Sequence, residues 1–212
     1  MGSLGANKTS AVVYEKPVIN TTFYKSTTQQ MKDIVADTYA DMQKEFPILS
    51  KAVTFDINNG GGFDAAGSAI NLDGRYMKEY LKRDSEYNDD YYEMYLRGVI
   101  AHELVHTVQS RMGKAQAEEV ASNILSSAVD KYVRDNAGTS KEQVLKDLKK
   151  AYGVRTLDSD ATRRPMMERM AVAVQHYYLS KKYPNTKKGV FNKSVAHIGY
   201  YVADELKREI RR

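Results

Sequence analysis

Two histidines and a glutamate at a fixed spacing are the residues of this chain best suited to chemistry. His102 and His106 lie four residues apart in the segment Gly98-Val-Ile-Ala-His-Glu-Leu-Val-His-Thr-Val-Gln109. On an α-helix both imidazoles project from one face, one turn apart, as two ligands of one metal ion must. Glu103 follows the first histidine, and a carboxylate there that is not a ligand can take a proton from metal-bound water. The pattern H-E-x-x-H therefore predicts a zinc peptidase helix.

The residues around this motif favour a buried helix. Positions 99, 100, 104, 105, 107 and 108 are all uncharged, as a helix that crosses a packed core requires. The competing interpretation is a buried helix with two core histidines and a salt-bridged glutamate. We favour the metal site because the segment holds two of the four histidines of the chain, both at ligand spacing.

Two histidines leave a catalytic zinc one protein ligand short, because such sites hold three protein ligands and a water. A third histidine in the arrangement H-E-x-x-H-x-x-G-x-x-H is excluded, since the required positions hold Gln109 and Met112. The remaining option is a glutamate from another helix that packs against the first. Three candidates stay open on this reasoning: Glu118 and Glu119 on the next predicted helix, and the more distant Glu168.

A resemblance favours one of these candidates. The segment that begins at Glu119 is similar to the thermolysin-type glutamate helix, in which the ligand is followed four residues later by an aspartate that supports a zinc-bound histidine. Here that later position is Asn123, whose amide can accept an imidazole N–H but brings no charge. The resemblance thus implies Glu119 as the third ligand and Asn123 as the residue that supports a histidine.

The elements that must position these residues differ between the two halves of the chain. Alternating apolar residues predict one or two strands over 11–24, interrupted by Pro17, and a third over 52–58 that a triple glycine at 60–62 ends. Apolar spacings of three and four predict helices elsewhere. The first expected helix is 26–46, with Ser26 or Thr27 as N-cap, and the second is 91–110, capped by the segment 88–90. Residues 76–90 are expected to form a charged helix or loop. Further helices are expected over 115–135 and around 144–152, 166–178 and 195–210.

A strand over residues 69–72 is the candidate binding edge for a substrate. Small and polar neighbours leave room on one side of it. In metallopeptidases the strand before the active-site helix often forms the sheet edge to which an extended peptide adds. We therefore expect Ala69, Ile70 and Asn71 to form the substrate edge, with an ordinary hairpin strand as the alternative.

Composition excludes several classes of protein. The chain has 212 residues and no cysteine, so neither a disulfide nor a thiolate metal site can form. No run of about 18 apolar residues exists, so we expect no membrane span. The net charge of +5 comes from scattered basic groups without a recognised nucleic-acid motif, so we expect no nucleic-acid partner. We expect a monomer.

Several segments resemble the basic secretory protein family of plants and its bacterial relatives, which are zincin metallopeptidases. The resemblance lies in Val53-Thr-Phe-Asp-Ile, in Ala69-Ile-Asn-Leu-Asp-Gly-Arg-Tyr76, and in the segment from Leu96 to Gln109. With the helix of Glu119 it covers about residues 28 to 135. It implies a zincin-like α+β fold, with a small mixed sheet and the active-site helix in the N-terminal half and an all-helical C-terminal half. It also implies secretion and a protein substrate.

The sequence therefore predicts a zinc-dependent metalloendopeptidase. Residues 1–12 are expected to be a disordered tail or an expression-vector scar. Residues 13–212 are expected to be one domain, with the sheet and active-site helix in 13–112 and a helical lobe in 113–212. His102, His106 and Glu119 would hold Zn²⁺, and Glu103 would be the general base. A secreted or periplasmic location is expected, with any signal peptide removed. The alternatives are a non-enzymatic secreted binding or defence protein and an intracellular toxin peptidase.

Overall fold

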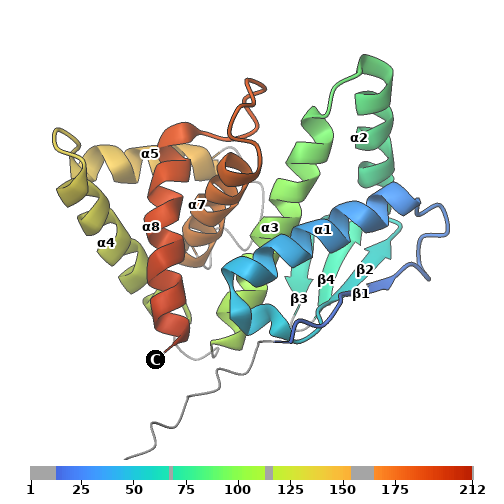
Figure 1. Cartoon of the computed structure of the whole chain (residues 1–212), viewed down its shortest axis with the longest axis horizontal. Coiled ribbons are helices and arrows are strands. Elements are labelled where there is room, and N and C mark those ends of the chain that lie inside the picture. The colour runs from blue at the N-terminus through green and yellow to red at the C-terminus, as the bar shows by residue number, and fades with distance from the viewer. Residues whose placement is uncertain (1–12, 67–68, 113–116, 154–164, 212) are drawn as a thin grey trace, which may run out of the picture.

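The computed structural model describes residues 13–66, 69–112, 117–153 and 165–211. The described part combines a four-stranded sheet with helices in its first half, and after residue 112 its regular elements are helices (Figure 1). The expected α+β class with a small mixed sheet is confirmed at this level. The expected tail over 1–12 lies outside the described residues.

The sheet has the strand order β1-β2-β4-β3. Strand β1 (Val18–Asn20) pairs in parallel with β2 (Thr54–Asn58), and β2 pairs in parallel with β4 (Ala69–Asp73). Strand β3 (Asp64–Ala66) pairs antiparallel with β4. Alternation of side chains buries one face of each central strand, through Phe55 and Ile57 on β2 and Ile70 and Leu72 on β4.

The position of β4 corrects the expected substrate edge. Ala69, Ile70 and Asn71 pair on one side with β2 and on the other with β3, so their backbone groups are already engaged. Strand β3 was not predicted, because three residues after a glycine loop are too short to show an alternating pattern. The described edge beside β4 is therefore formed by Asp64–Ala66.

The helices follow the predicted ranges closely. The N-cap of α1 is Thr28 rather than Ser26 or Thr27, and the charged segment after β4 is a helix. Within the segment 88–90, Asp89 accepts the N–H of Tyr91, but the next two N–H groups of α3 are accepted by Asp84 of α2 instead. The helical elements are α1 (Gln29–Glu45), a 3₁₀ turn (Pro47–Ser50), α2 (Gly74–Tyr87), α3 (Tyr91–Arg111), α4 (Ala117–Asp135), α5 (Lys141–Gly153), α7 (Pro165–Lys182) and α8 (Lys193–Ile210).

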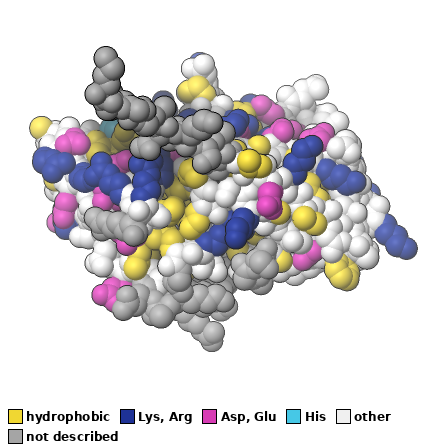
Figure 2. Space-filling model, turned by 60° about the horizontal axis from the view of Figure 1, so that its bottom comes forward, with side chains coloured by type: hydrophobic (Ala, Val, Ile, Leu, Met, Phe, Trp, Pro, Cys, Tyr) yellow, Lys and Arg dark blue, Asp and Glu magenta, His cyan; other side chains and the backbone are white. Residues whose placement is uncertain are grey.

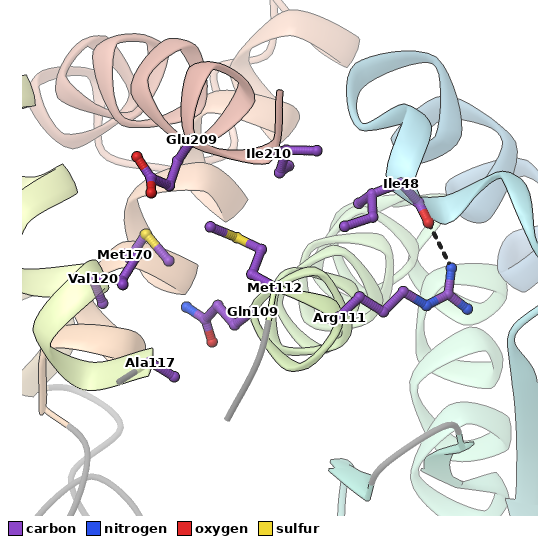
Figure 3. Close-up of a pocket in the computed structure, with 10 residues that line it drawn as sticks. Ile48, Gln109, Arg111, Met112, Ala117, Val120, Met170, Glu209 and Ile210 are labelled. Atoms are coloured by element: carbon purple, nitrogen blue, oxygen red, sulfur yellow. Dashed lines mark hydrogen bonds between the residues drawn. The ribbon is translucent and has the colours of Figure 1, made fainter. Parts of the chain in front are cut away.

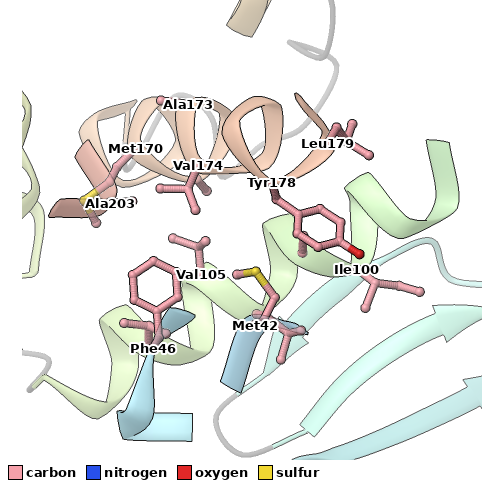
Figure 4. Packing of buried hydrophobic residues seen from close by; sticks show 14 of the residues in the cluster. Met42, Phe46, Ile100, Val105, Met170, Ala173, Val174, Tyr178, Leu179 and Ala203 are labelled. Atoms are coloured by element: carbon pink, nitrogen blue, oxygen red, sulfur yellow. The ribbon is translucent and has the colours of Figure 1, made fainter. Parts of the chain in front are cut away.

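One hydrophobic core joins the two halves of the chain. Helix α3 lies between α1 on one side and α7 on the other, and α7 also packs against α4 and α8. Buried side chains from three helices meet there: Met42 of α1 with Phe46 directly after it, Ile100 and Val105 of α3, and Val174 and Tyr178 of α7 (Figure 4). The active-site helix predicted from the sequence is thus the element at the centre of the molecule.

The surface carries both signs of charge. On the face in Figure 2, Lys and Arg side chains form several separate groups with Asp and Glu between them. None of the described helices is both long enough and apolar enough to cross a membrane.

Candidate metal centre

Helix α3 positions the two histidines because it is buried on nearly all sides. Its successive residues Val99, Ile100 and Ala101 point in different directions around the axis and are only 4, 0 and 0% exposed, as expected of a helix that is apolar around its circumference. His102 is only 5% exposed. The rings of His102 and His106 lie nearly perpendicular, with centroids 4.8 Å apart, so both point from the same face of α3.

Glu168 of α7 completes a group with the two histidines. His102 Nε2 lies 3.2 Å from one carboxylate oxygen of Glu168, and His106 Nε2 lies 3.1 Å from the other. The two Nε2 atoms are 3.1 Å apart. These three side chains form a possible metal-binding group, with ligand atoms all within 4.8 Å of one another.

The donor atoms of this group suit a zinc ion. Two imidazole nitrogens and one carboxylate oxygen are a common ligand set of catalytic zinc. A tetrahedral ion with bonds of about 2.0–2.1 Å holds its ligand atoms about 3.3–3.4 Å apart. The distances between Nε2 and carboxylate oxygens here are 3.1 and 3.2 Å, so only small movements are needed to fit the ion.

The electrostatics of the group also favour a cation. Burial disfavours the charged form of His106, but the hydrogen bond with Glu168 and the charges of Glu103 and Glu168 outweigh it and raise its pKa to about 9. Burial raises the pKa of Glu168, yet the hydrogen bonds and charges of the two histidines outweigh it and hold the pKa of this carboxyl well below its usual range. Negative charge that stabilises protons on imidazole can stabilise a metal ion in their place.

Glu103 is the expected general base, and it lies on α3 directly after His102. Its side chain is 7% exposed and its charge acts on His106. A carboxylate kept away from bulk water next to a cation site has the surroundings that a general base requires.

The first turn of α7, which carries Glu168, is held in place by helix α4. The carboxylate of Glu118 on α4 accepts the backbone N–H groups of Met166 and Met167, at 2.8 and 3.0 Å. Negative charge is stabilising at a helix N-terminus, where backbone N–H groups have no helical partner. Glu118, a reserve candidate for the ligand, therefore acts as a cap for the helix that carries Glu168.

Glu119 and Asn123 are not brought to the histidines. Glu119 is exposed on α4, and the described group contains Glu168 instead. Asn123 is also exposed and lines a separate cavity with Ser127 and Glu205. Helix α4 turns its apolar face inward, which directs Glu118 toward α7 and Glu119 toward solvent. The geometry favours Glu168 over Glu119 as the third ligand.

Gln109 supports a histidine in the way expected of Asn123. Its Oε1 lies 2.7 Å from His106 Nδ1, and its Nε2 donates to the carbonyl of Met167 at 3.0 Å. From the sequence, Gln109 was interpreted only as a position where a third histidine is absent. Its position three residues after His106, on the same helix face, was the available signal.

Several histidines and tyrosines of the helical half interact with one another or with the backbone. Tyr177 packs against Tyr200, and Tyr132 of α4 packs against His197 and Tyr201, with ring centroids 5.1 to 5.9 Å apart. The ring Nδ1 of His176 accepts the N–H of Asn192.

A cavity of about 350 Å³ lies at the C-terminal end of α3. Gln109 of α3 and Met112, which follows this helix, face Ala117 and Val120 of α4 and Met170 of α7 across it (Figure 3). Gln109 thus stands between this cavity and His106.

Comparisons with models of protein families, with characterised proteins and with solved structures found no match to this chain.

Proposed function

We propose that the protein is a zinc-dependent endopeptidase in which His102, His106 and Glu168 hold the metal. The observation that carries the proposal is the convergence of three ligand atoms from α3 and α7 on one point beside a buried Glu103. Zincin-type architecture, secretion and membership of the basic secretory protein family belong to the same proposal.

Each residue has one role in the proposed reaction. A zinc ion held by the three ligands would lower the pKa of water and polarise a carbonyl group. Glu103 would accept a proton from the attacking water and pass it to the leaving amine. Glu168 would supply the single negative charge of the ligand set, and its two hydrogen-bonded histidines keep it ionised.

An extended peptide is the substrate class that the sheet edge supports. Strand β3 packs against α3, and its outer side carries no partner among the described strands. The backbone of Asp64–Ala66 could pair with a peptide and align it across the helix that carries Glu103.

Glu103→Gln tests the proposed reaction. We expect peptide hydrolysis to fall about 10²–10⁴-fold while bound zinc is unchanged, because the amide keeps the shape but cannot accept the proton. Hydrolysis of a casein or peptide-library substrate and zinc content are measured on the same samples. Unchanged hydrolysis in Glu103→Gln would remove Glu103 from the mechanism.

One observation favours a second candidate function, a binding protein in which the metal ion only stabilises the fold. The side chains of His102, His106 and Glu168 are only 6, 15 and 17% exposed. For such a protein zinc would raise the unfolding temperature, but wild type would hydrolyse no peptide in the same assay.

A further inference from the structure

We infer that Gln109 is a positioning residue that fixes His106 in the orientation and protonation needed to bind the metal through Nε2. The inference rests on the proposed function for its role toward zinc. The hydrogen bonds that carry it do not depend on the metal.

The orientation of the Gln109 amide follows from its backbone partner. The carbonyl oxygen of Met167 can only accept a hydrogen bond, so the group that faces it at 3.0 Å must be the amide nitrogen. Oε1 of Gln109 is then the atom 2.7 Å from Nδ1 of His106. Because this oxygen can only accept, Nδ1 of His106 must carry the hydrogen.

This protonation state leaves Nε2 of His106 as the nitrogen for the metal. In both the neutral and the cationic ring Gln109 holds a hydrogen on Nδ1, so a metal ion would bind at Nε2 and displace any hydrogen there. Nε2 is the atom that lies 3.1 Å from Glu168 and 3.1 Å from Nε2 of His102. Outer hydrogen bonds of this kind orient a ligand and raise its basicity.

Gln109 also links the two helices that supply the ligands. It belongs to α3, like His106, and donates to Met167, which immediately precedes Glu168 on α7. The side chain is 3% exposed, so water competes little for either hydrogen bond. One amide therefore sets the position of His106 relative to the first turn of α7.

Two substitutions separate this role from simple packing. Gln109→Met keeps the length of an unbranched side chain and removes both hydrogen bonds, and the neighbouring cavity lined by Met112 and Met170 can accept it. Gln109→Glu keeps an oxygen that accepts from Nδ1 of His106. The matched control is Gln43→Met, because Gln43 is also buried and donates to the backbone carbonyls of Glu15 and Leu49.

Two readouts are measured on each variant. The first is the imidazole Nδ1–H resonance of His106 in ¹⁵N-histidine-labelled protein without metal, assigned by its loss in His106→Gln. The chain has only four histidines, so the spectrum is simple. The second is the zinc dissociation constant from competition with a chromophoric chelator.

We expect Gln109→Met to lose the protected Nδ1–H signal and to bind zinc about 10–100-fold more weakly than wild type. Gln109→Glu should keep the signal and bind zinc more tightly than Gln109→Met, although its carboxylate cannot donate to the carbonyl of Met167. Gln43→Met should match wild type in both readouts. A Gln109→Met protein with wild-type affinity and an unchanged signal would overturn the inference. If wild type itself binds no zinc, the proposed function fails, and the Nδ1–H signal alone decides whether Gln109 orients His106.

Discussion

Two adjacent glutamate residues of α4 differ in their burial and in their hydrogen-bond partners. Glu118 is half-buried and accepts two backbone N–H groups of α7, whereas Glu119 is exposed on the same helix. Helix geometry explains the difference, because successive residues point about 100° apart around the axis.

This difference predicts unequal effects on stability. Glu118→Ala should lower the free energy of unfolding by about 1 kcal/mol, as the loss of a helix cap does, because two N–H groups of α7 lose their acceptor. Glu119→Ala, its matched control, should leave stability nearly unchanged. Urea denaturation of both variants measures the effect, and equal stability of the two would contradict the capping role.

The two histidines of the site and the neighbouring Glu103 could be predicted from the sequence, but the third ligand could not. His102, Glu103 and His106 were found because their spacing lies within one helix, where periodicity fixes which side chains share a face. Glu168 was one of three candidates for the third ligand, but a resemblance favoured Glu119. The sequence signal for Glu168 was a lone carboxylate in the first turn of an apolar helix, because a charge buried there requires partners.

Among the secondary-structure elements, α7 and α8 approach each other closely at Gly199. A Cβ at Gly199 of α8 would lie 2.0 Å from the carbonyl oxygen of Ala173 on α7. A Cβ at Gly98 of α3 would instead meet the end of the Leu179 side chain, at 2.8 Å. The backbone of Ala173 is fixed within helix α7 and cannot move aside, whereas the end of the Leu179 side chain can change its rotamer.

Gly199→Ala is therefore expected to destabilise the protein by about 1–3 kcal/mol, as overpacking of a core does. Gly98→Ala should cost clearly less, because Leu179 can change its rotamer and alanine is the better helix former by about 1 kcal/mol. Thermal unfolding of both variants checks the order. A Gly199→Ala protein as stable as wild type would show that α7 and α8 are not this close.

Element prediction succeeded where patterns were long and failed where they were short. Helices such as α1 and α3 repeat their apolar spacing over several turns. Strand β3 has three residues, and its pairing with β4 depends on how the preceding glycines turn the chain. Gly60, Gly61 and Gly62 all have positive φ angles, a conformation open mainly to glycine, but sequence alone does not tell where such a loop returns.

In the whole molecule, the N-terminal half and the helical half are connected by ion pairs of Glu45. Glu45 at the end of α1 forms ion pairs with Lys181 of α7 at 2.8 Å and with Lys207 of α8 at 2.6 Å. Burial disfavours its charge, but the hydrogen bonds from the two lysines outweigh it and lower the pKa of Glu45.

The direction of this shift gives a pH-dependent prediction. Because the pKa of Glu45 is lower in the folded chain, the unfolded chain binds more protons in acid. The stabilisation is complete above the usual glutamate range and is lost as pH falls through the lower, folded pKa. Glu45→Gln should cost about 1 kcal/mol at pH 7 and progressively less in acid. Glu86→Gln, which breaks an exposed pair with Lys82, is the control and should show little effect at any pH.

If α3 and α7 together hold a metal ion, zinc binding must depend on Glu168. The decisive measurement is the zinc bound per chain after incubation with zinc and gel filtration, in wild type, Glu168→Ala and Glu119→Ala. We predict one zinc per chain in wild type and in Glu119→Ala, and loss or strong weakening of binding in Glu168→Ala, because among the described residues Glu168 completes the group with both histidines. Zinc retained by Glu168→Ala, or no zinc in wild type, would contradict a metal site between α3 and α7.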